Sequence, residues 1–146
     1  MIRRFILRHY VSAYARVKLV IVAFTKCAML TRGNIMSRST INALDIANWF
    51  IARANREKIE NFGEGVSNLK LQKIIYFAQA AHLALEDEEL FSDEIHAWSY
   101  GPVVNKVYHE FKGKEKTPIV RPSSDKYLRI NAETGSFLED IWGAPR

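Results

Sequence analysis

The chain has 146 residues, of which 48% are hydrophobic and 25% are charged, and it contains seven glycines and four prolines. These values fit one ordinary globular domain and exclude collagen-like, disulfide-rich and wholly disordered classes of protein. The formal net charge is +5, but residues 1–35 carry seven of the 21 Lys and Arg residues and no Asp or Glu. The rest of the chain is therefore slightly acidic and lacks the clustered positive charge that attracts nucleic acid.

Residues 1–35 form a basic extension that differs in composition from the rest of the chain. Their longest apolar run, residues 19–24, is far shorter than the roughly 20 residues that cross a bilayer, and they have no clean signal-peptide cleavage site. An organellar presequence or a membrane-surface helix stays open as an alternative. We favour a dispensable or spurious extension, with Met36 as the true start. The only cysteine, Cys27, lies in it, so the body of the protein has no disulfide or cysteine-type metal site.

Two amphipathic helices are predicted in the first half of the body. Residues 41–58 repeat apolar side chains at helical spacing, and Ser39 or Thr40 is the expected N-cap. After a turn marked by two glycines, Ser67 caps a second helix over residues 68–85. The main apolar face of this helix is formed by Leu71, Ile74, Ile75, Ala78, Ala81 and Leu85. A second stripe consists of Gln72, Tyr76, Gln79 and Leu83, so this helix should be the central, largely buried one.

The second half predicts shorter elements. The acidic residues 86–89 indicate a solvated turn, and residues 94–100 a short extended segment buried on both sides. Gly101 and Pro102 predict a sharp corner that opens a helix over residues 103–112. Residues 117–120 and 127–130 could pair as a hairpin. A last helix begins near residue 137, soon before the sequence stops.

The expected fold class is therefore mainly α, or α+β at most. We expect a compact helical domain around the central helix, with a short β-hairpin or extended segments. The domain should span residues 36–146 and be cut short at its C-terminal end.

None of the common catalytic or cofactor motifs occurs in the sequence. The glycines form no phosphate-binding loop, and there is no nucleophile elbow or zinc-binding histidine pair. His82 with Glu86, and Glu94 with His96, are interpreted as ordinary helix or surface pairs rather than metal or acid–base sites. We therefore expect no catalytic, metal-binding or cofactor-binding residue and no enzymatic activity.

A phage- or prophage-encoded DNA-binding regulator stays open as a second function. Helices with short turns and a hairpin could form a winged helix-turn-helix, in which one helix enters the major groove. The candidate helix, residues 103–112, exposes Asn105, Lys106, His109 and Lys112. Against this function, two glutamates dilute the basic patch and the body as a whole is slightly acidic.

Two long sequence words carry the strongest information. They are LKLQKIIYFAQ at residues 69–79 and AWSYGPVVNKVY at residues 97–108. They resemble the paired words LKLQKLLYYAQ and AWxYGPVVxxVY of the SocA-type antitoxin family, also called the Panacea domain, which includes phage-associated, GepA-like proteins. The resemblance covers about residues 43–112 and extends more loosely to residue 142. Residues 1–35 have no counterpart in the family.

The resemblance implies a helical, cytoplasmic protein of bacterial or prophage origin that acts as the antitoxin of a toxin–antitoxin system. Such a protein neutralises its cognate toxin, encoded by an adjacent gene, through direct binding. Some members also act as proteolytic adaptors, so a AAA+ protease is implied as a further partner. No cofactor, membrane or nucleic-acid partner is implied.

Within the two words, the polar and aromatic residues are the candidates for partner binding. Buried polar groups need a hydrogen-bond partner, and large amphipathic side chains are typical of interface hot spots. The candidates are Lys70, Gln72, Lys73, Tyr76, Gln79, Trp98 and Tyr100. The alternative, that they brace the central helix against the corner at Gly101, stays open. The residues expected to have a structural role are Leu71, Ile75, Gly101, Pro102 and Val103.

Overall fold

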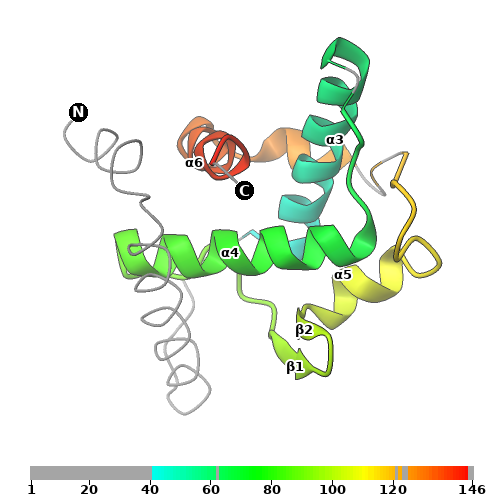
Figure 1. The fold of residues 1–146 in the computed structure, drawn as a ribbon. Coiled ribbons are helices and arrows are strands. Elements are labelled where there is room, and N and C mark those ends of the chain that lie inside the picture. Colours follow the sequence, from blue (N-terminus) through cyan, green and yellow to red (C-terminus); the bar gives the residue numbers. More distant parts are fainter. Residues whose placement is uncertain (1–40, 62, 121, 123–124, 145–146) are drawn as a thin grey trace.

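A computed structural model describes residues 41–144, except residues 62, 121, 123 and 124. Its elements are α3 (Ala43–Asn61), α4 (Asn68–Glu86), β1 (His96–Trp98), β2 (Gly101–Val103), α5 (Asn105–Glu110), the 3-10 helix η1 (Asp125–Arg129) and α6 (Ala132–Trp142). In Figure 1, α4 crosses the middle of the molecule, with α3 and α6 above it and the β-hairpin below. The prediction of a mainly α fold is confirmed. Residues 1–35, Met36 and the expected caps Ser39 and Thr40 lie outside the described residues.

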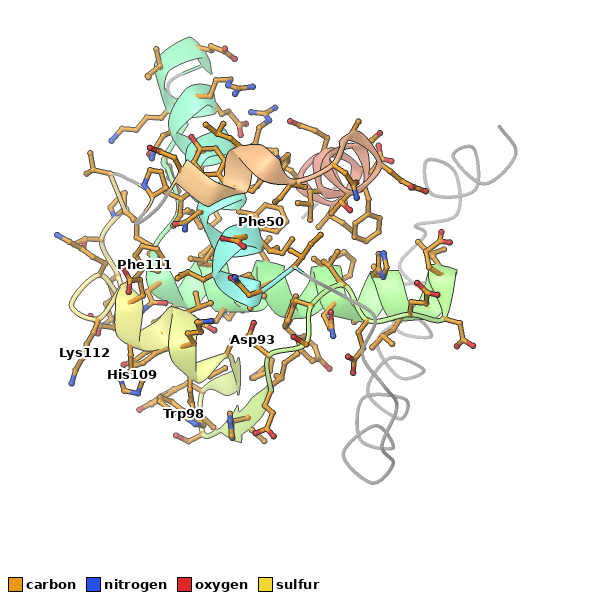
Figure 2. All side chains as sticks on the ribbon, turned by 180° about the vertical axis from the view of Figure 1, so that it is seen from behind. Phe50, Asp93, Trp98, His109, Phe111 and Lys112 are labelled. Atoms are coloured by element: carbon orange, nitrogen blue, oxygen red, sulfur yellow. The ribbon has the colours of Figure 1, made fainter. Side chains whose placement is uncertain are left out.

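The hydrophobic core lies between α3, α4, α5 and α6, and Phe50 of α3 is at its centre (Figure 2). The Phe50 ring lies 6.2 Å from the Trp142 ring of α6, measured between centroids. Each fully buried aliphatic or aromatic side chain contributes roughly 1.5–3 kcal/mol. The largest fully buried apolar side chains are Phe50, Phe91, Ile46, Ile51, Leu71, Ile75 and Leu138.

Helix α3 begins at two side-chain acceptors. Asn42 Oδ1 accepts from the Asp45 backbone N–H (3.0 Å), and Asp93 Oδ2 accepts from the Ala43 N–H (2.6 Å). The free amides of the first turn are thus satisfied by a local cap and by a distant loop. The loop that precedes the hairpin is thereby joined to the start of α3.

Helix α4 forms as predicted. Ser67 Oγ accepts from the Lys70 N–H (3.4 Å), and the helix ends at Asp87, which has a left-handed conformation (φ 59°). Four of the six predicted core positions, Leu71, Ile75, Ala78 and Ala81, are buried, and Ile74 is partly buried. The prediction for Leu85 is wrong, since this residue is 39% exposed. It stands in the last turn of α4, which extends past α6 in Figure 1.

Residues 96–103 form an antiparallel hairpin, in which Trp98 pairs with Gly101 and His96 with Val103. The prediction that residues 94–100 are buried on both sides is wrong, because Trp98 is 40% and Tyr100 90% exposed. The predicted corner at Gly101 and Pro102 is wrong as well, since both residues lie in β2 and the helix begins only at Asn105. Proline is tolerated in such a strand because, among the described residues, β2 pairs with β1 alone, so no other strand there needs the missing N–H.

The predicted hairpin of residues 117–120 and 127–130 is absent. Residues 125–129 form η1, which packs against α3. Residues 117–120 bind other parts of the chain instead. The Ile119 N–H donates to Val66 O (2.9 Å), and Asn55 Nδ2 donates to Val120 O (2.9 Å). The last helix is present as α6, but it begins at Ala132, with its N-cap at Asn131, and not near the predicted residue 137.

Candidate functional site

Gln72 is buried and joins α4 to the start of α5. Its Oε1 accepts a hydrogen bond from the Val104 N–H (2.9 Å), and its Nε2 donates to Asn68 Oδ1 (3.1 Å). Val104 is the residue between β2 and α5, so this bond fixes the point at which the hairpin passes into the helix. A buried amide is tolerated when its oxygen and its nitrogen both have partners, and Gln72 meets that condition.

Asn68 extends this network to the other end of α5. Its Nδ2 donates to the backbone oxygens of Tyr108 (3.0 Å) and Phe111 (3.1 Å), and its own backbone N–H donates to Lys114 O (2.8 Å). Helix α5 has only six residues, a length that is not stable in isolation. Asn68 and Gln72 therefore hold both ends of α5 against α4.

Gln79 holds the loop that leads into the hairpin against α4. Its Oε1 accepts from the backbone N–H groups of Leu90 (2.9 Å) and Phe91 (3.1 Å), and its Nε2 donates to Phe91 O (3.1 Å). Gln72 and Gln79 are seven residues apart, about two helical turns, so they lie on the same side of α4. Between them they anchor the chain before and after the hairpin.

The segment held by these glutamines carries a group of side chains that we call the hairpin face: the exposed Trp98, Tyr100, His109 and Lys112 and the half-buried Tyr108. The rings of Trp98 and Tyr108 meet edge-on with centroids 5.0 Å apart, and Tyr108 meets His109 at 5.7 Å. In Figure 2, Trp98, His109 and Lys112 follow one another along the outer edge of the hairpin and α5.

The hairpin face is open beside Trp98. Gly101, its partner across the hairpin, has φ +120°, which favours glycine. No heavy atom lies within 4 Å of the position that a Cβ would occupy there. Glycine is thus needed at this position for its backbone conformation and not for close packing, and Trp98 is 40% exposed.

Charged groups flank the hairpin face unequally. At the hairpin end, the Glu94 carboxylate lies 3.7 Å from His96 Nε2, and Lys106 Nζ lies 3.7 Å from Asp93 Oδ1. At the other end, the exposed lysines 112, 114 and 116 follow α5. Glu115, between two of them, accepts from the Gly113 N–H (2.9 Å), and this hydrogen bond lowers the pKa of its carboxyl group.

The seven predicted partner-binding residues occupy different environments. Gln72 and Gln79 are buried and bound to backbone groups, which is the bracing arrangement described above. Trp98 and Tyr100 lie exposed on the hairpin. The two pairs therefore differ in environment: the glutamines bind the backbone on either side of the hairpin, and the hairpin carries the aromatics.

The other three candidates lie on α4. Lys73 is exposed, whereas Lys70 and Tyr76 are half-buried. Lys70 lines an open depression of about 360 Å³, together with Glu57 and Trp142, where the indole Nε1–H donates to Glu57 Oε2 (2.7 Å). Lys70 thus belongs to the surroundings of α3 and α6.

The residues expected to have a structural role have two locations. Leu71 and Ile75 are fully buried on α4, and Val103 is buried in β2. Gly101 and Pro102 are half-buried in the same strand. Gly101, Pro102 and Val103 therefore form a strand and not the expected corner.

Three members of the hairpin face, Tyr108, His109 and Lys112, were not among the predicted partner-binding residues. His109 and Lys112 were predicted only as exposed residues of a helix that would bind DNA. Tyr108 ends the second word, but its contact with Trp98 depends on the hairpin, which brings the strand back toward α5. The sequence signal that could have identified these residues is the set of predicted exposed positions within residues 105–112.

The described residues give little support to the other site types considered. No group of three or more His, Cys, Asp or Glu side chains in the described ranges could hold a metal ion. Helix α5 is shorter than the predicted DNA-reading helix, and within the described part of the chain no hairpin follows it. No helix in this part is long and apolar enough to span a membrane.

Residues 71–140 match the family model described as antitoxin SocA-like, Panacea domain. The match begins in α4 and ends in α6, so it contains the hairpin face and the buried Gln72 and Gln79. No curated protein and no solved structure matches the chain. The resemblance carried by the two sequence words is therefore confirmed over residues 71–140, which match the SocA-like Panacea antitoxin family model.

Proposed function

We propose that this protein is the antitoxin of a toxin–antitoxin pair and that it neutralises its toxin by direct binding through the hairpin face. The observation that carries the proposal is the family match over residues 71–140, which includes every residue of that face. The toxin is expected to be the product of an adjacent gene.

The hairpin face has the properties of a protein-binding surface. Trp98 and Tyr100 are exposed, and tryptophan and tyrosine are enriched among the residues that dominate binding energy. Gln72, Gln79 and Asn68 hold the surrounding backbone through buried hydrogen bonds. A surface that is ordered before binding loses less conformational entropy when the partner arrives, which favours affinity.

The test is co-expression of the full chain with the product of the adjacent gene, read out by growth and by pull-down. We expect the unaltered chain to rescue growth and to retain the toxin. Trp98→Ala combined with Tyr100→Ala should weaken binding by at least tenfold, because hot-spot truncations cost about 2 kcal/mol or more. Circular dichroism would verify that the variant keeps its helices.

The matched control is Ile59→Ala, which truncates a highly exposed apolar residue on α3, outside the hairpin face. This variant should bind and rescue like the unaltered chain. Equal loss in both variants, or full rescue by the hairpin variant, would contradict the proposed surface. Failure of the unaltered chain to bind or to rescue would contradict the antitoxin function itself.

Delivery of the toxin to a AAA+ protease is the further activity that the family resemblance implies. If it operates here, the bound toxin should be degraded faster in cells that contain the antitoxin than in cells without it. A toxin half-life that is unchanged or longer in the presence of the antitoxin would contradict delivery to a protease, and neutralisation would then rest on binding alone.

A further inference from the structure

The hairpin face has different charges at its two ends, and this asymmetry bears on the chemistry of its partner. Residues 112–116 contain three exposed lysines and one glutamate. The glutamate, Glu115, is bound to the Gly113 backbone N–H at 2.9 Å, so it is directed into its own loop. Lys112, Lys114 and Lys116 are therefore the groups that this end offers to a partner.

The opposite end of the face carries the exposed carboxylate of Glu94, while the Asp93 carboxylate there lies 3.7 Å from Lys106 Nζ. The Glu94 side chain is 87% exposed, and its carboxylate lies 3.7 Å from His96 Nε2. In Figure 2, Trp98 and His109 lie between Asp93, the residue next to Glu94 in the chain, and Lys112, and the Trp98 ring contacts Tyr108. The order along the surface is thus acid, aromatic, base.

We propose that the segment of the toxin that this surface recognises is acidic on one side of an apolar anchor residue. The anchor packs against the rings of Trp98 and Tyr108, and the carboxylates of the segment face Lys112, Lys114 and Lys116. The inference rests on the proposed function, because it assigns the chemistry of the partner at that same surface. Complementary charge at the rim of an interface speeds encounter and fixes orientation, while the buried anchor supplies most of the affinity.

A nucleic acid is the other polyanion that lysines and aromatic rings can bind, but the surface suits it less well. A strand of nucleic acid carries its charge continuously, so it would place phosphates beside Glu94 and beside the exposed Glu110. The rings of Trp98 and Tyr108 also meet at an interplanar angle of 65°, so they do not form the parallel faces on which successive bases stack. A short protein segment can carry its carboxylates on one side of the anchor only, so it need not place negative charge beside Glu94.

The experiment measures toxin binding by the full chain at several salt concentrations. Lys112→Glu combined with Lys114→Glu should lower the affinity by about tenfold or more at low salt, mainly by slowing association, and the difference should shrink as salt rises. Trp98→Ala should lower affinity to a similar extent at every salt concentration. Lys58→Glu, which reverses an exposed lysine on α3, is the matched control and should bind as the unaltered chain does.

The outcomes separate this inference from the proposed function. Loss of affinity in Trp98→Ala, with unchanged binding by the lysine variant, would overturn the acidic segment and leave the antitoxin function standing. Loss of toxin binding by the unaltered chain would remove both. Retention of a single-stranded oligonucleotide at physiological salt by the unaltered chain, lost in the lysine variant while toxin binding persists, would assign the lysines to nucleic acid and overturn the inference.

Discussion

At the level of single residues, Gln72 shows why an amide occupies a position that periodicity would give to an apolar side chain. Its side chain accepts from Val104 N–H and donates to Asn68, so both of its polar atoms are used. A carboxylate could not donate, and an aliphatic side chain could do neither. The hydrogen bonds therefore decide the residue type, and burial alone does not.

Replacing this amide tests its role. Gln72→Ala should lower the free energy of unfolding by about 2–4 kcal/mol, because it leaves the buried Val104 N–H and Asn68 Oδ1 without a partner and creates a small cavity. Urea denaturation followed by circular dichroism measures the loss. Lys73→Ala, at the exposed neighbouring position, should stay within about 0.5 kcal/mol of the unaltered protein. Equal stability of the two variants would show that the Gln72 network contributes nothing.

At the level of elements, α6 shows how an amphipathic helix is attached to a core. Leu138, Ile141 and Trp142 are buried on one face, and the Trp142 indole donates to Glu57 of α3. On the outer face, Arg53 Nε of α3 donates to Glu139 at 2.9 Å. That pair is partly exposed, so it adds well under about 1 kcal/mol, and the apolar face stabilises the contact.

The same helix contains a glycine for which the structure provides no need. Gly135 has no positive φ, and, apart from its chain neighbours and the nearby backbone of its own helix, no described heavy atom lies within 4 Å of the position that its Cβ would take. Gly135→Ala should therefore raise the free energy of unfolding by about 0.5–1 kcal/mol, since alanine restricts the unfolded chain and favours helix. Gly101→Ala, at φ +120°, is the contrasting variant and should destabilise the hairpin. Thermal melts compare the two, and a lower melting temperature for Gly135→Ala would contradict the expectation.

At the level of the whole molecule, the family match and the folding unit do not coincide. The match covers residues 71–140, whereas the core also requires α3, which supplies Ile46, Phe50 and Ile51. The hairpin depends on α3 as well, because Asp93 binds the first amide of that helix. The functional surface is therefore held by residues that the match leaves out.

A fragment of residues 71–140 should consequently be unfolded. It exposes the apolar faces of α4, α5 and α6 that α3 covers, so it cannot recover the free energy needed to order the chain. We expect no cooperative thermal transition and strong binding of a hydrophobic dye. A chain that starts at Met36 should instead melt like the full chain. A cooperative melt of the 71–140 fragment would mean that α3 is dispensable.

Local patterns by themselves determined much of this protein. The period of apolar residues and the cap at Ser67 predicted α4, and the two words on residues 69–79 and 97–108 indicated the family. Periodicity also located the last helix and most of the core on α4. These features depend on neighbours within a few residues, for which the energy of capping and of one apolar face is sufficient.

Only the tertiary structure decided the rest. Gly101 and Pro102 fit a corner or a strand equally well, and the pairing of residues 96–98 with 101–103 selects the strand. Residues 117–120 had a strand-like pattern, but hydrogen bonds to Val66 and Asn55 hold them apart from residues 127–130. The exposure of Trp98 and the burial of Gln72 likewise depend on which distant backbone groups come near. The physical reason is that a polar or aromatic side chain is equally compatible with surface and interior until its partners are placed.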